Sequence, residues 1–485
     1  MKLVQSSETT LKLFPFQAED TEALQDRKSV LLAWEMGTGK TYAGIELDLR
    51  HRALRRAEGF GQLPTLVVAP LSTLESTWAE HFEELTDLDY VVIDPKKRDL
   101  FVKAIKNKIA DVYIMHWEAL RLVQKELRTF QFGHIIADEV HRAKSRKAQQ
   151  TLALKKLRAQ KKTALSGTPV TNKPYDLWSI LNWMYPEQYR SFWKFYERYC
   201  DYEIAYPHGY HKFLGPKNEE ELLQTIAPYY RRHLKLQKCC EHHPNGVQPD
   251  LPEKYYTKIE VDLTPKQRKA YEEMKKEMIA WLDNQDETVP LVAPVVIAQL
   301  VRLSQLSVAY ASIGLPSQND LEKGLTSSPV VLTEPSSKLD ALMQIIEDNE
   351  EEQIVVFSQF KGAIKLIQER LRRAKISYAT VTGDVAASDR PNEIRRFQTQ
   401  DARIFLGTIG AGGEGITLTS ASTVVFVDRD WSPAKNAQAE DRLHRIGQRN
   451  AVQVIDIVSR DTVDQGRHQT LELKKSWIKR VLGDI

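Results

Sequence analysis

Two arginines near the end of the chain, Arg442 and Arg445, are placed to act on a phosphate group. They lie three residues apart in the segment Gln438–Gln448, which is expected to be helical, and residues at that spacing share one face of a helix. Arginine in such a position neutralises the charge that develops on a phosphoryl group during its transfer. Gln438, at the start of the segment, is expected to couple this site to the rest of the chain.

A glycine-rich segment near the other end of the chain, Trp34–Thr41, has the pattern of a phosphate-binding loop. It follows a predicted strand and precedes a helical pattern, so that backbone N–H groups and a helix N-terminus would face the phosphates of ATP. The first glycine of the general pattern is absent, because Trp34 occupies its position. Taken alone, the loop also fits a tight turn between a strand and a helix.

The residues of this loop have distinct expected roles. Lys40 would reach the β- and γ-phosphates, and the Thr41 hydroxyl would bind magnesium. The backbone at Gly37, Thr38 and Gly39 would surround the phosphates. Because the loop and the arginines lie far apart in sequence, we expect ATP to bind between two lobes and its hydrolysis to rearrange them, as in a motor.

Two adjacent acids, Asp138 and Glu139, end a predicted buried strand. Asp138 would coordinate magnesium, and Glu139 would orient and activate the attacking water. A strand that ends in two acids is common by chance. Its position after the glycine-rich loop, at a spacing that fits a parallel sheet, favours the catalytic interpretation.

Two further segments are assigned roles because of their position in the chain relative to the glycine-rich loop and the paired acids. Ser166, Gly167 and Thr168 end another predicted strand, where small hydroxyl residues can sense the γ-phosphate and relay its loss. Upstream, the side-chain amide of Gln17 is suited to pair with adenine, although a plain surface glutamine is the alternative interpretation.

The composition is that of a soluble globular protein with more than one domain. A chain of 485 residues is too long for one core, and 42% hydrophobic and 27% charged residues are ordinary values. With a net charge of only +3, local patches rather than the whole-protein field must attract any polyanion. Three cysteines make no disulfide framework and the N-terminus has no apolar signal core, so we expect an intracellular location. That would be the cytoplasm of a bacterial or virus-infected bacterial cell, or the nucleus of a eukaryotic one.

Short apolar runs rich in β-branched residues recur in both halves and alternate with helix-like segments. This alternation is typical of βαβ units around a buried parallel sheet. In the first half the predicted strands are Ser29–Ala33, Leu66–Ala69, Val112–Met115, Ile135–Ala137 and Thr163–Leu165. In the second half they are Ile354–Phe357, Tyr378–Val381, Ile404–Leu406, Val424–Val427 and Val452–Val458. We therefore predict an α/β protein with two parallel-sheet domains of one kind in tandem.

The expected domain boundaries follow from these runs and from the loops between them. They are an N-terminal lobe at residues 1–237, a linker at 238–254, a C-terminal lobe at 255–465 and a C-terminal helix at 466–485. Helical protrusions are expected at about residues 172–235 and 264–335. Aromatic residues crowd the first protrusion, and packing between helices is favoured there over a surface that stacks nucleic-acid bases.

The order of these motifs resembles that of the Swi/Snf-type ATPases of helicase superfamily 2. The matching segments are Phe14–Gln17, Glu35–Thr41, Ala69–Thr73, Asp138–His141, Leu165–Pro169, Gly412–Thr419 and Gln438–Gln448. The last of them, which ends in His-Arg-Ile-Gly-Gln, is highly specific to this branch. Weaker matches are Tyr230–Lys235, Leu251–Lys254, Leu263–Arg268, Ser336–Leu339 and Asp428–Pro433.

The resemblance implies two RecA-like lobes with helical protrusions and an ATPase stimulated by double-stranded DNA. Members of the family generally track along a duplex without separating its strands. Carried onto this chain, the resemblance assigns Gln17 to adenine, Gly415 to the ATP site, and Arg442 and Arg445 to completing that site from the second lobe. The chain departs from the family at Trp34, where an acid is usual. It also departs at Val140, where glycine or alanine is usual, and at Thr417, where asparagine is usual.

A motor of this kind holds the phosphate backbone of DNA without reading bases. Residues 142–162 contain nine lysines and arginines and no acid, directly after the paired acids, so we expect Lys144 and Arg146 to lie near DNA. A solvated helix face is the alternative. The resemblance adds further candidate contacts, which are Ser72, Thr73, His116, Trp117, Gln359, Gly412, Gly413 and Trp431.

These features predict a compact, monomeric ATP-dependent DNA translocase with ATP and magnesium as its cofactors. Its partners would be double-stranded DNA and a DNA-bound protein that it displaces, or DNA structures such as repair intermediates. The alternatives are a strand-separating DNA or RNA helicase and an ATP-switched clamp on DNA or protein. No structural zinc is expected, because the adjacent cysteines and histidines of Cys239–His243 lack the spacing of zinc ligands.

Overall fold

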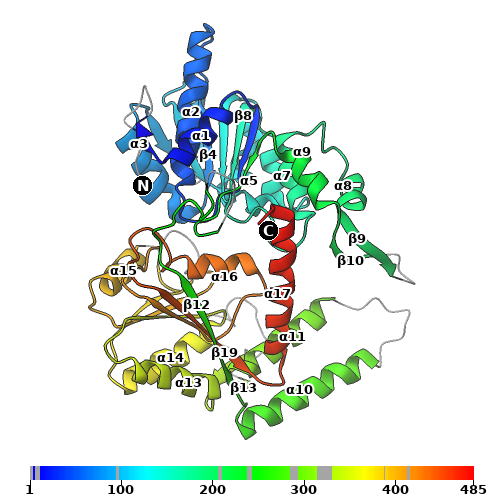
Figure 1. Ribbon diagram of the computed structural model, residues 1–485, viewed down its shortest axis with the longest axis vertical. Helices are drawn as coiled ribbons and strands as arrows, with labels where there is room; N and C mark the ends of the chain where they lie inside the picture. The colour runs from blue at the N-terminus through cyan, green and yellow to red at the C-terminus, as the bar shows by residue number, and fades with distance from the viewer. Residues whose placement is uncertain are drawn as a thin grey trace. The chain divides into compact units, whose positions relative to one another are not determined.

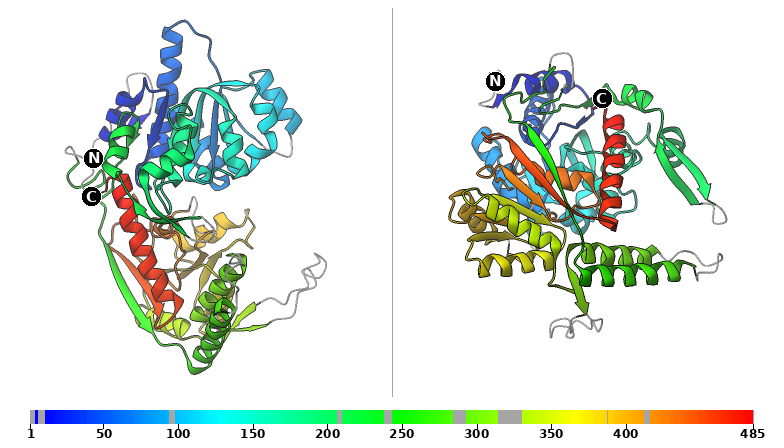
Figure 2. Two further views of the ribbon diagram at one scale, coloured as in Figure 1. Left: turned by 90° about the vertical axis from the view of Figure 1, so that its right-hand side faces the viewer. Right: turned by 60° about the horizontal axis from the view of Figure 1, so that its bottom comes forward.

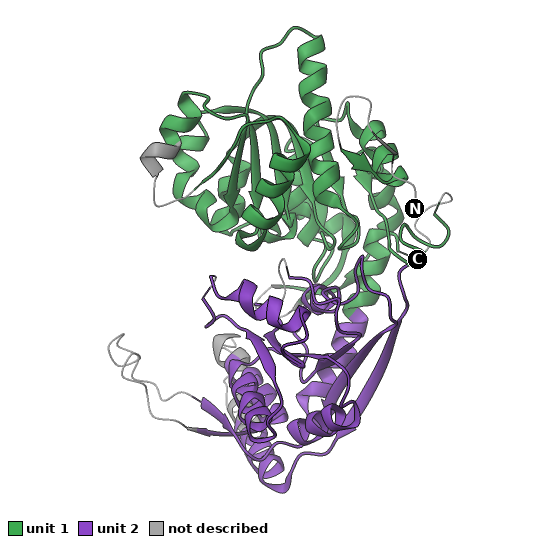
Figure 3. Ribbon diagram, turned by 90° about the vertical axis from the view of Figure 1, so that its left-hand side faces the viewer, with its two compact units in different colours: residues 1–250, 474–485 green, residues 251–473 purple. Residues whose placement is uncertain are grey.

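The computed structural model describes residues 4–5, 11–93, 98–205, 210–237, 243–283, 293–313, 330–386, 388–411 and 416–484. The internal contacts divide the chain into two compact units (Figure 3). Unit 1 comprises Met1–Asp250 and Lys474–Ile485, and unit 2 comprises Leu251–Leu473. The division therefore falls inside the expected linker and again near the C-terminus.

Unit 1 is built on a seven-stranded sheet in which all neighbouring strands are parallel. In sheet order the strands are β11 (Tyr230–Arg231), β3 (Ser29–Leu32), β8 (Arg158–Leu165), β7 (Gln131–Asp138), β4 (Thr65–Ala69), β6 (Val112–His116) and β5 (Tyr90–Val92). All five strands predicted in this half are present. The sequence did not reveal β5 and β11, because each is only two or three residues long.

Helices cover both faces of this sheet, as the alternation of buried side chains requires (Figure 1). On one face lie α1 (Pro15–Leu24), α2 (Lys40–Ala57), the π-helical turn η2 (Leu74–Ala79) and α3 (Glu80–Leu85). On the other lie α4 (Arg98–Lys106), α5 (Trp117–Leu127), α6 (Gln149–Lys155) and α7 (Asp176–Met184). Short 3-10 turns, η1 (Leu71–Thr73) and η4 (Val140–Ala143), follow the carboxyl ends of β4 and β7.

Unit 2 repeats the plan with six parallel strands. Their order is β12 (Lys254–Val261), β19 (Val452–Ser459), β18 (Thr423–Phe426), β15 (Ile354–Ser358), β17 (Ile404–Thr408) and β16 (Tyr378–Val381). The flanking helices are α13 (Ser337–Asp348), α14 (Lys361–Arg373), α15 (Arg390–Gln398) and α16 (Pro433–Glu440). The five predicted strands are all found, and the two α/β domains in tandem are confirmed.

Each unit carries an insertion where a protrusion was expected. In unit 1 it holds α8 (Phe192–Tyr199), α9 (Glu219–Ile226) and a projecting hairpin of β9 (Cys200–Ala205) and β10 (Tyr210–Pro216) (Figures 1 and 2). In unit 2 it holds the adjacent helices α10 (Pro265–Asp283) and α11 (Ala293–Val308), and the hairpin of β13 (Tyr310–Ile313) and β14 (Val330–Thr333). A further short pair near the N-terminus joins β1 (Val4–Gln5) to β2 (Lys12–Leu13).

The aromatic residues of the first insertion pack against one another. The ring of Phe192 lies edge-on to Trp178 at 5.3 Å, and Tyr175 contacts Tyr196 at 5.4 Å between centroids. Most of these rings are buried, although Trp193 is 48% exposed. Packing between elements therefore accounts for most of this cluster.

The C-terminal helix α17 (Val463–Leu482) begins three residues earlier than the expected 466. Its last turns belong to unit 1, where the hydroxyl of Tyr230 donates to the carbonyl of Leu482 at 3.0 Å. Trp477 packs edge-on against Phe213 of the β9–β10 hairpin. Among the described residues, no helix combines the length and the apolar character needed to cross a membrane.

Candidate active site

The phosphate loop joins β3 to α2, and its backbone needs glycine at two positions. Gly37 and Gly39 have φ angles of +77° and +78°, in the left-handed region that disfavours other residues. A Cβ atom on Gly39 would also lie 2.4 Å from the side-chain nitrogen of Gln17. Helix α2 begins directly afterwards at Lys40, so its first N–H groups point toward the loop.

Lys40 is buried within this loop. Its Nζ donates to the carbonyls of Trp34 at 3.0 Å and Glu35 at 3.1 Å. Burial lowers the pKa of Lys40, and the charges of Glu139 and Asp138 oppose that shift. To bind phosphate, the ammonium group must exchange two loop carbonyls for phosphate oxygens, and the loop backbone has to adjust.

Gln17 holds the loop from α1. Its Nε2 donates to the carbonyl of Thr38 at 2.8 Å and more weakly to that of Gly39 at 3.4 Å, and its Oε1 accepts from the N–H of Phe14. The residue is 2% exposed, so it is not a plain surface glutamine. The adenine contact stays a prediction, and the structure adds a role for this amide in shaping the loop.

Trp34, which departs from the usual family residue, is also integrated into this region. Its indole Nε1 donates to Asp20 at 3.0 Å, and the same carboxylate oxygen lies 2.8 Å from Nε2 of His233. The ring of Phe16 packs edge-on against Trp34. An acid from α1 thus lies beside the tryptophan that replaces the usual acid of the loop.

The paired acids lie at the carboxyl end of β7. The carboxylate of Asp138 accepts from Nε1 of Trp78 at 3.0 Å and from the N–H of Glu139 at 2.9 Å. The indole of Trp117 donates to the carbonyl of Asp138 at 2.8 Å. Burial, reinforced by the neighbouring Glu139, raises the pKa of Asp138 to about 6.

This donor set fits a magnesium ion. Buried Asp138 and half-buried Glu139 are adjacent at the end of β7, and a hard cation prefers oxygen ligands. Thr41 and Asp138 would hold the ion together with phosphate oxygens. When bound, magnesium would neutralise charge on the phosphates.

Asp138→Asn is expected to stabilise the metal-free fold at pH 8 while it damages the site. A pKa raised from 3.8 to about 6 means that ionised Asp138 costs about 1–3 kcal/mol of folding free energy above pH 6. The cost fades as pH falls through 6 toward 4, because the folded state then binds the proton. Denaturant unfolding without metal at pH 8 and pH 4 measures this difference. An equal effect at both pH values, or none beyond that of the exposed control Asp87→Asn, would contradict it.

A chain of contacts joins the acids to the Ser166–Thr168 segment. The carboxylate of Glu139 lies 3.1 Å from Nδ1 of His141, and the same nitrogen lies 3.1 Å from Oγ of Ser166. The N–H of Thr168 donates to this Oγ at 3.2 Å. Ser166 is thus joined to the acids through His141, a residue that sequence reasoning did not single out, and the coupling role of Ser166 and Thr168 stays a prediction.

Gly167 lies against the phosphate loop from the other side. A Cβ atom there would come within 2.8 Å of the Met36 side chain. Arg232 binds the carbonyls of Gly167 at 3.0 Å and Ala33 at 2.6 Å, and it pairs with Asp484 at 2.7 Å. One guanidinium thus ties together the segments on both sides of the loop.

In unit 2, Arg442 and Arg445 are not helical, which corrects the sequence prediction. Helix α16 ends at Glu440, and turns follow it up to Gly447, which has a φ angle of +103°. The backbone carbonyl of Arg442 accepts from Leu418 at 2.8 Å, so pairing with a neighbouring segment replaces continuation of the helix. Gln438 is buried on α16.

The two arginines nevertheless lie together. Arg442 donates to the carbonyl of Ile416 at 3.3 Å, and Arg445 donates to the hydroxyl of Thr417 at 2.9 Å. Burial lowers the pKa of Arg445. Thr417, the departure from the family asparagine, is therefore the residue that orients Arg445. The predicted residues Gly412, Gly413 and Gly415 lie outside the described residues, as do Cys239 and Cys240.

The structure revises one candidate DNA contact. The side chain of Trp117 is fully buried and donates to the backbone carbonyl of Asp138, so its ring supports the end of β7 and does not face solvent. His116 caps the N-terminus of α5 and lies 3.1 Å from Glu118. Ser72 and Thr73 lie in η1, directly after β4.

The other candidate contacts lie at turns or strand ends. The N–H of Gln359 donates to Asp428 at 3.1 Å, just after β15. The ring of Trp431 is 36% exposed and packs under the guanidinium of Arg467. Their contact with DNA stays a prediction.

Only part of the basic tract faces solvent. Lys161 is buried and donates to the carbonyls of Gln25 and Arg27, and Lys162 donates to that of Trp183. Arg146 lies 4.0 Å from the centroid of the Phe192 ring, and Lys144 donates to Thr171. The C-terminal lysines of the tract thus stabilise unit 1, while Lys144, Arg146 and exposed Lys147 remain candidates for DNA binding.

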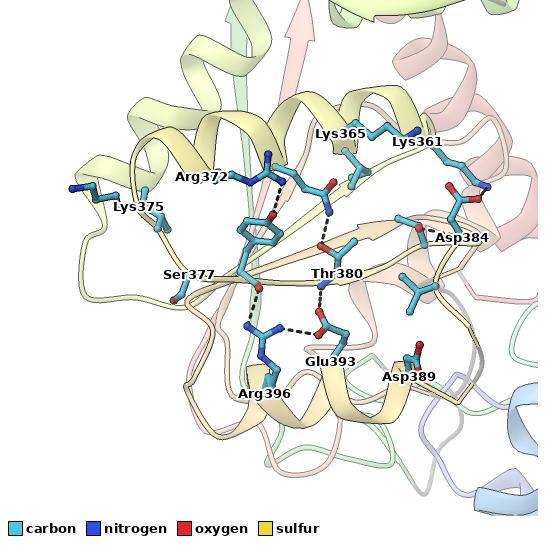
Figure 4. Close-up of a pocket in the computed structure, with 16 residues that line it drawn as sticks. Lys361, Lys365, Arg372, Lys375, Ser377, Thr380, Asp384, Asp389, Glu393 and Arg396 are labelled. Atoms are coloured by element: carbon cyan, nitrogen blue, oxygen red, sulfur yellow. Dashed lines mark hydrogen bonds and ion pairs between the residues drawn. The ribbon is translucent and has the colours of Figure 1, made fainter. Parts of the chain in front are cut away.

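A cavity of about 830 Å³ lies in unit 2, between α14 and α15 over the edge strand β16 (Figure 4). None of the predicted site residues lines it. Glu393 accepts from the N–H of Thr380, and Arg396 donates to the carbonyl of Tyr378. These side chains cap the exposed sheet edge, which explains the groove without assigning it chemistry.

Both units match models of known protein families. Residues 18–305 match the model of the SNF2-related domain, and residues 337–447 match that of the helicase conserved C-terminal domain. The first match alone covers more than half of the chain.

The chain is also similar to individual proteins. The chain is 29% identical to human chromodomain-helicase-DNA-binding protein 6, over 95% of this chain and 17% of that protein. It is 27% identical to the uncharacterized ATP-dependent helicase MG018 of Mycoplasma genitalium, over 95% of this chain and 41% of that protein. The chain thus spans less than half the length of these relatives. A solved SWI2/SNF2 ATPase core of Sulfolobus solfataricus, in complex with double-stranded DNA, is 25% identical over 100% of this chain and 96% of that one, with a TM-score of 0.43.

Proposed function

The chain belongs to the SNF2 family of helicase-like ATPases, and from this premise we propose that it is an ATP-dependent double-stranded DNA translocase. Its substrate would be ATP with magnesium, and its track would be the phosphate backbone of a duplex. Movement along the duplex would displace bound proteins or remodel DNA structures. Strand separation is not required for this activity.

The contact chain from Glu139 through His141 to Ser166 is the observation that carries the proposal. A translocase must convert the loss of the γ-phosphate into movement. Here the residue that would position the attacking water is joined, through one imidazole, to the segment that follows β8. Any shift of Glu139 during hydrolysis is therefore transmitted to Ser166 and Thr168.

One feature of a relative and one of this chain support DNA as the track. The name of the human relative includes DNA binding. The candidate contacts at Ser72, His116 and Gln359 lie at or just after the carboxyl ends of parallel strands, where α/β proteins bind ligands. Contacts of this type hold a backbone without reading bases, so binding should weaken steeply with salt.

Steady-state ATP hydrolysis tests the proposal with the protein alone, with duplex DNA, with single-stranded DNA and with RNA. Duplex should stimulate turnover, and Lys40→Ala should abolish it. Displacement of a triplex-forming strand should accompany hydrolysis, while a forked duplex should remain paired. Stimulation by single strands or RNA only would indicate a helicase instead, and stimulation without triplex displacement would indicate a clamp.

Replacing Lys144, Arg146 and Lys147 together by alanine is expected to weaken duplex stimulation. Each lost phosphate contact should lower the slope of log affinity against log salt by about 0.9. Duplex affinity and stimulated turnover at several salt concentrations measure this. Lys156→Ala with Arg158→Ala, two exposed basic residues of the same tract, is the matched control. Unchanged stimulation in the triple variant would exclude these residues from the DNA contact.

A further inference from the structure

The chain segment after β11, which leads out of unit 1, is hydrogen-bonded to the phosphate loop. After β11, the carbonyl of His233 accepts from the N–H of Glu35 at 2.8 Å. The N–H of Lys235 donates to the Glu35 carboxylate at 2.7 Å. Glu35, the residue just before Met36 in the loop, is thus held through both its backbone and its side chain.

Val247 and Gln248 lie against the same segment. Their N–H groups donate to the carbonyls of Leu234 and Lys235 at 2.9 and 2.8 Å. Gly246 permits this close approach, because its φ angle is +80° and a Cβ atom there would lie 2.2 Å from the Lys235 carbonyl oxygen. Residues 246–248 are therefore fixed to the segment that holds the loop.

Gln248 itself binds the phosphate loop. It is 6% exposed, and its Nε2 donates to the carbonyl of Gly37 at 3.0 Å. Its Oε1 is also buried and has no hydrogen-bond partner among the described residues. One buried amide thus binds the loop just beyond Met36, close to the end of unit 1 at Asp250.

ATP binding must disturb this contact. Lys40 donates to the carbonyls of Trp34 and Glu35, and these bonds are exchanged when Lys40 turns to phosphate oxygens. The loop N–H groups must also point at the phosphates, which reorients the peptide units that include Gly37. A change at the Gly37 carbonyl acts directly on Gln248, and the covalent chain continues from Gln248 to Leu251 and unit 2.

We propose that Gln248 is a positioning residue that couples the phosphate loop to the segment leading into unit 2. The amide holds the Gly37 carbonyl in one arrangement of the loop. It yields, or gains a partner for its Oε1, when the loop closes on ATP. The proposal deepens the ATPase function and rests on it, since the coupling has a purpose only if nucleotide binding drives unit 2.

Two substitutions at Gln248 test the proposal in the full chain. Gln248→Ala removes the contact, and Gln248→Glu keeps the size but replaces the donor with a carboxylate that repels the Gly37 carbonyl. The ratio of DNA-stimulated to basal ATP turnover is expected to fall by at least about fivefold, the lower range of coupling between sites. KM for ATP should change less than this ratio.

Hydrogen exchange provides a readout that needs no DNA. In the natural chain, a non-hydrolysable ATP analogue should change exchange at the amides of Val247 and Gln248 by about three- to tenfold, the effect of one hydrogen bond. In Gln248→Ala this response should disappear. If DNA does not stimulate the natural chain, the translocase proposal fails, while the exchange experiment still decides the role of Gln248.

Gln62→Ala is the matched control. Gln62 also lies in unit 1, donates from Nε2 to a backbone carbonyl, that of Arg52 at 3.2 Å, and has a buried Oε1 without a partner among the described residues. Gln62 lies outside the phosphate loop and outside the segment that leads out of unit 1. If Gln248 were merely structural, Gln248→Ala and Gln62→Ala should both lower the melting temperature, and both should leave the ratio of DNA-stimulated to basal turnover unchanged. An unchanged ratio and an unchanged exchange response in Gln248→Ala would overturn the proposal.

Discussion

Replacing Arg445 by alanine is expected to lower ATP turnover by about 10³-fold or more, with ATP binding largely retained. Arg445 lies in unit 2, whereas the residues expected to bind the phosphates lie in unit 1. An arginine that acts on the charge of the transition state contributes to the chemical step and little to ground-state binding. Single-turnover hydrolysis, together with equilibrium binding of a fluorescent nucleotide, separates the two effects.

The orientation of Arg445 provides an internal check. Its guanidinium donates to the Thr417 hydroxyl, so Thr417→Val should lower turnover in the same direction but by less. Arg449→Ala changes an exposed arginine of the same segment and should have little effect. If Arg445→Ala weakened ATP binding as much as turnover, Arg445 would be a binding residue and its assigned role would be wrong.

Replacing Glu139 by glutamine is expected to lower turnover by about 10²- to 10⁴-fold, because the amide cannot accept a proton from the attacking water. Glutamine has the same shape and can keep the 3.1 Å contact with His141, so the link to Ser166 should persist. The variant should therefore bind ATP and DNA in a nearly arrested state. ATP hydrolysis and duplex binding in the presence of ATP measure the two properties.

An exposed acid at the end of α2 serves as the control, since Glu58→Gln removes one negative charge from unit 1 far along the chain from β7. Loss of duplex binding in Glu139→Gln, with folding intact, would show that Glu139 maintains the DNA-binding conformation. Turnover within a factor of ten of the natural chain would show that another group positions the water.

The motifs that sequence reasoning located correctly are those in which function depends on backbone conformation over a few residues. Gly37 and Gly39 adopt the left-handed φ angles that a phosphate loop needs, and their spacing alone predicts this. Buried parallel strands are continuous apolar runs, so the ten predicted strands are all present. Both properties are local, and a linear pattern records them.

Long-range partners account for what sequence reasoning missed. The segment after Glu440 has helical spacing, yet it turns because Arg442 pairs with Leu418 on another segment. Trp117 follows β6, where an exposed DNA contact was predicted. Its indole is instead buried and donates to the carbonyl of Asp138. His141 ends the matching segment Asp138–His141 but was given no role from sequence, and Gln248 belongs to no motif, so only their neighbours in space reveal what they contact.

The sequence by itself determined the family, the α/β class, the phosphate loop, the paired acids and the pair of arginines. Each of these depends on residue types at short separations, where covalent geometry and side-chain chemistry leave few choices. The tertiary structure decided which carbonyls Lys40 and Gln248 bind, which hydroxyl orients Arg445 and which basic residues are buried. Those pairings join residues that are distant in sequence or are fixed by a particular turn of the backbone. They form because buried polar groups must find partners when the sheet and its helices exclude water.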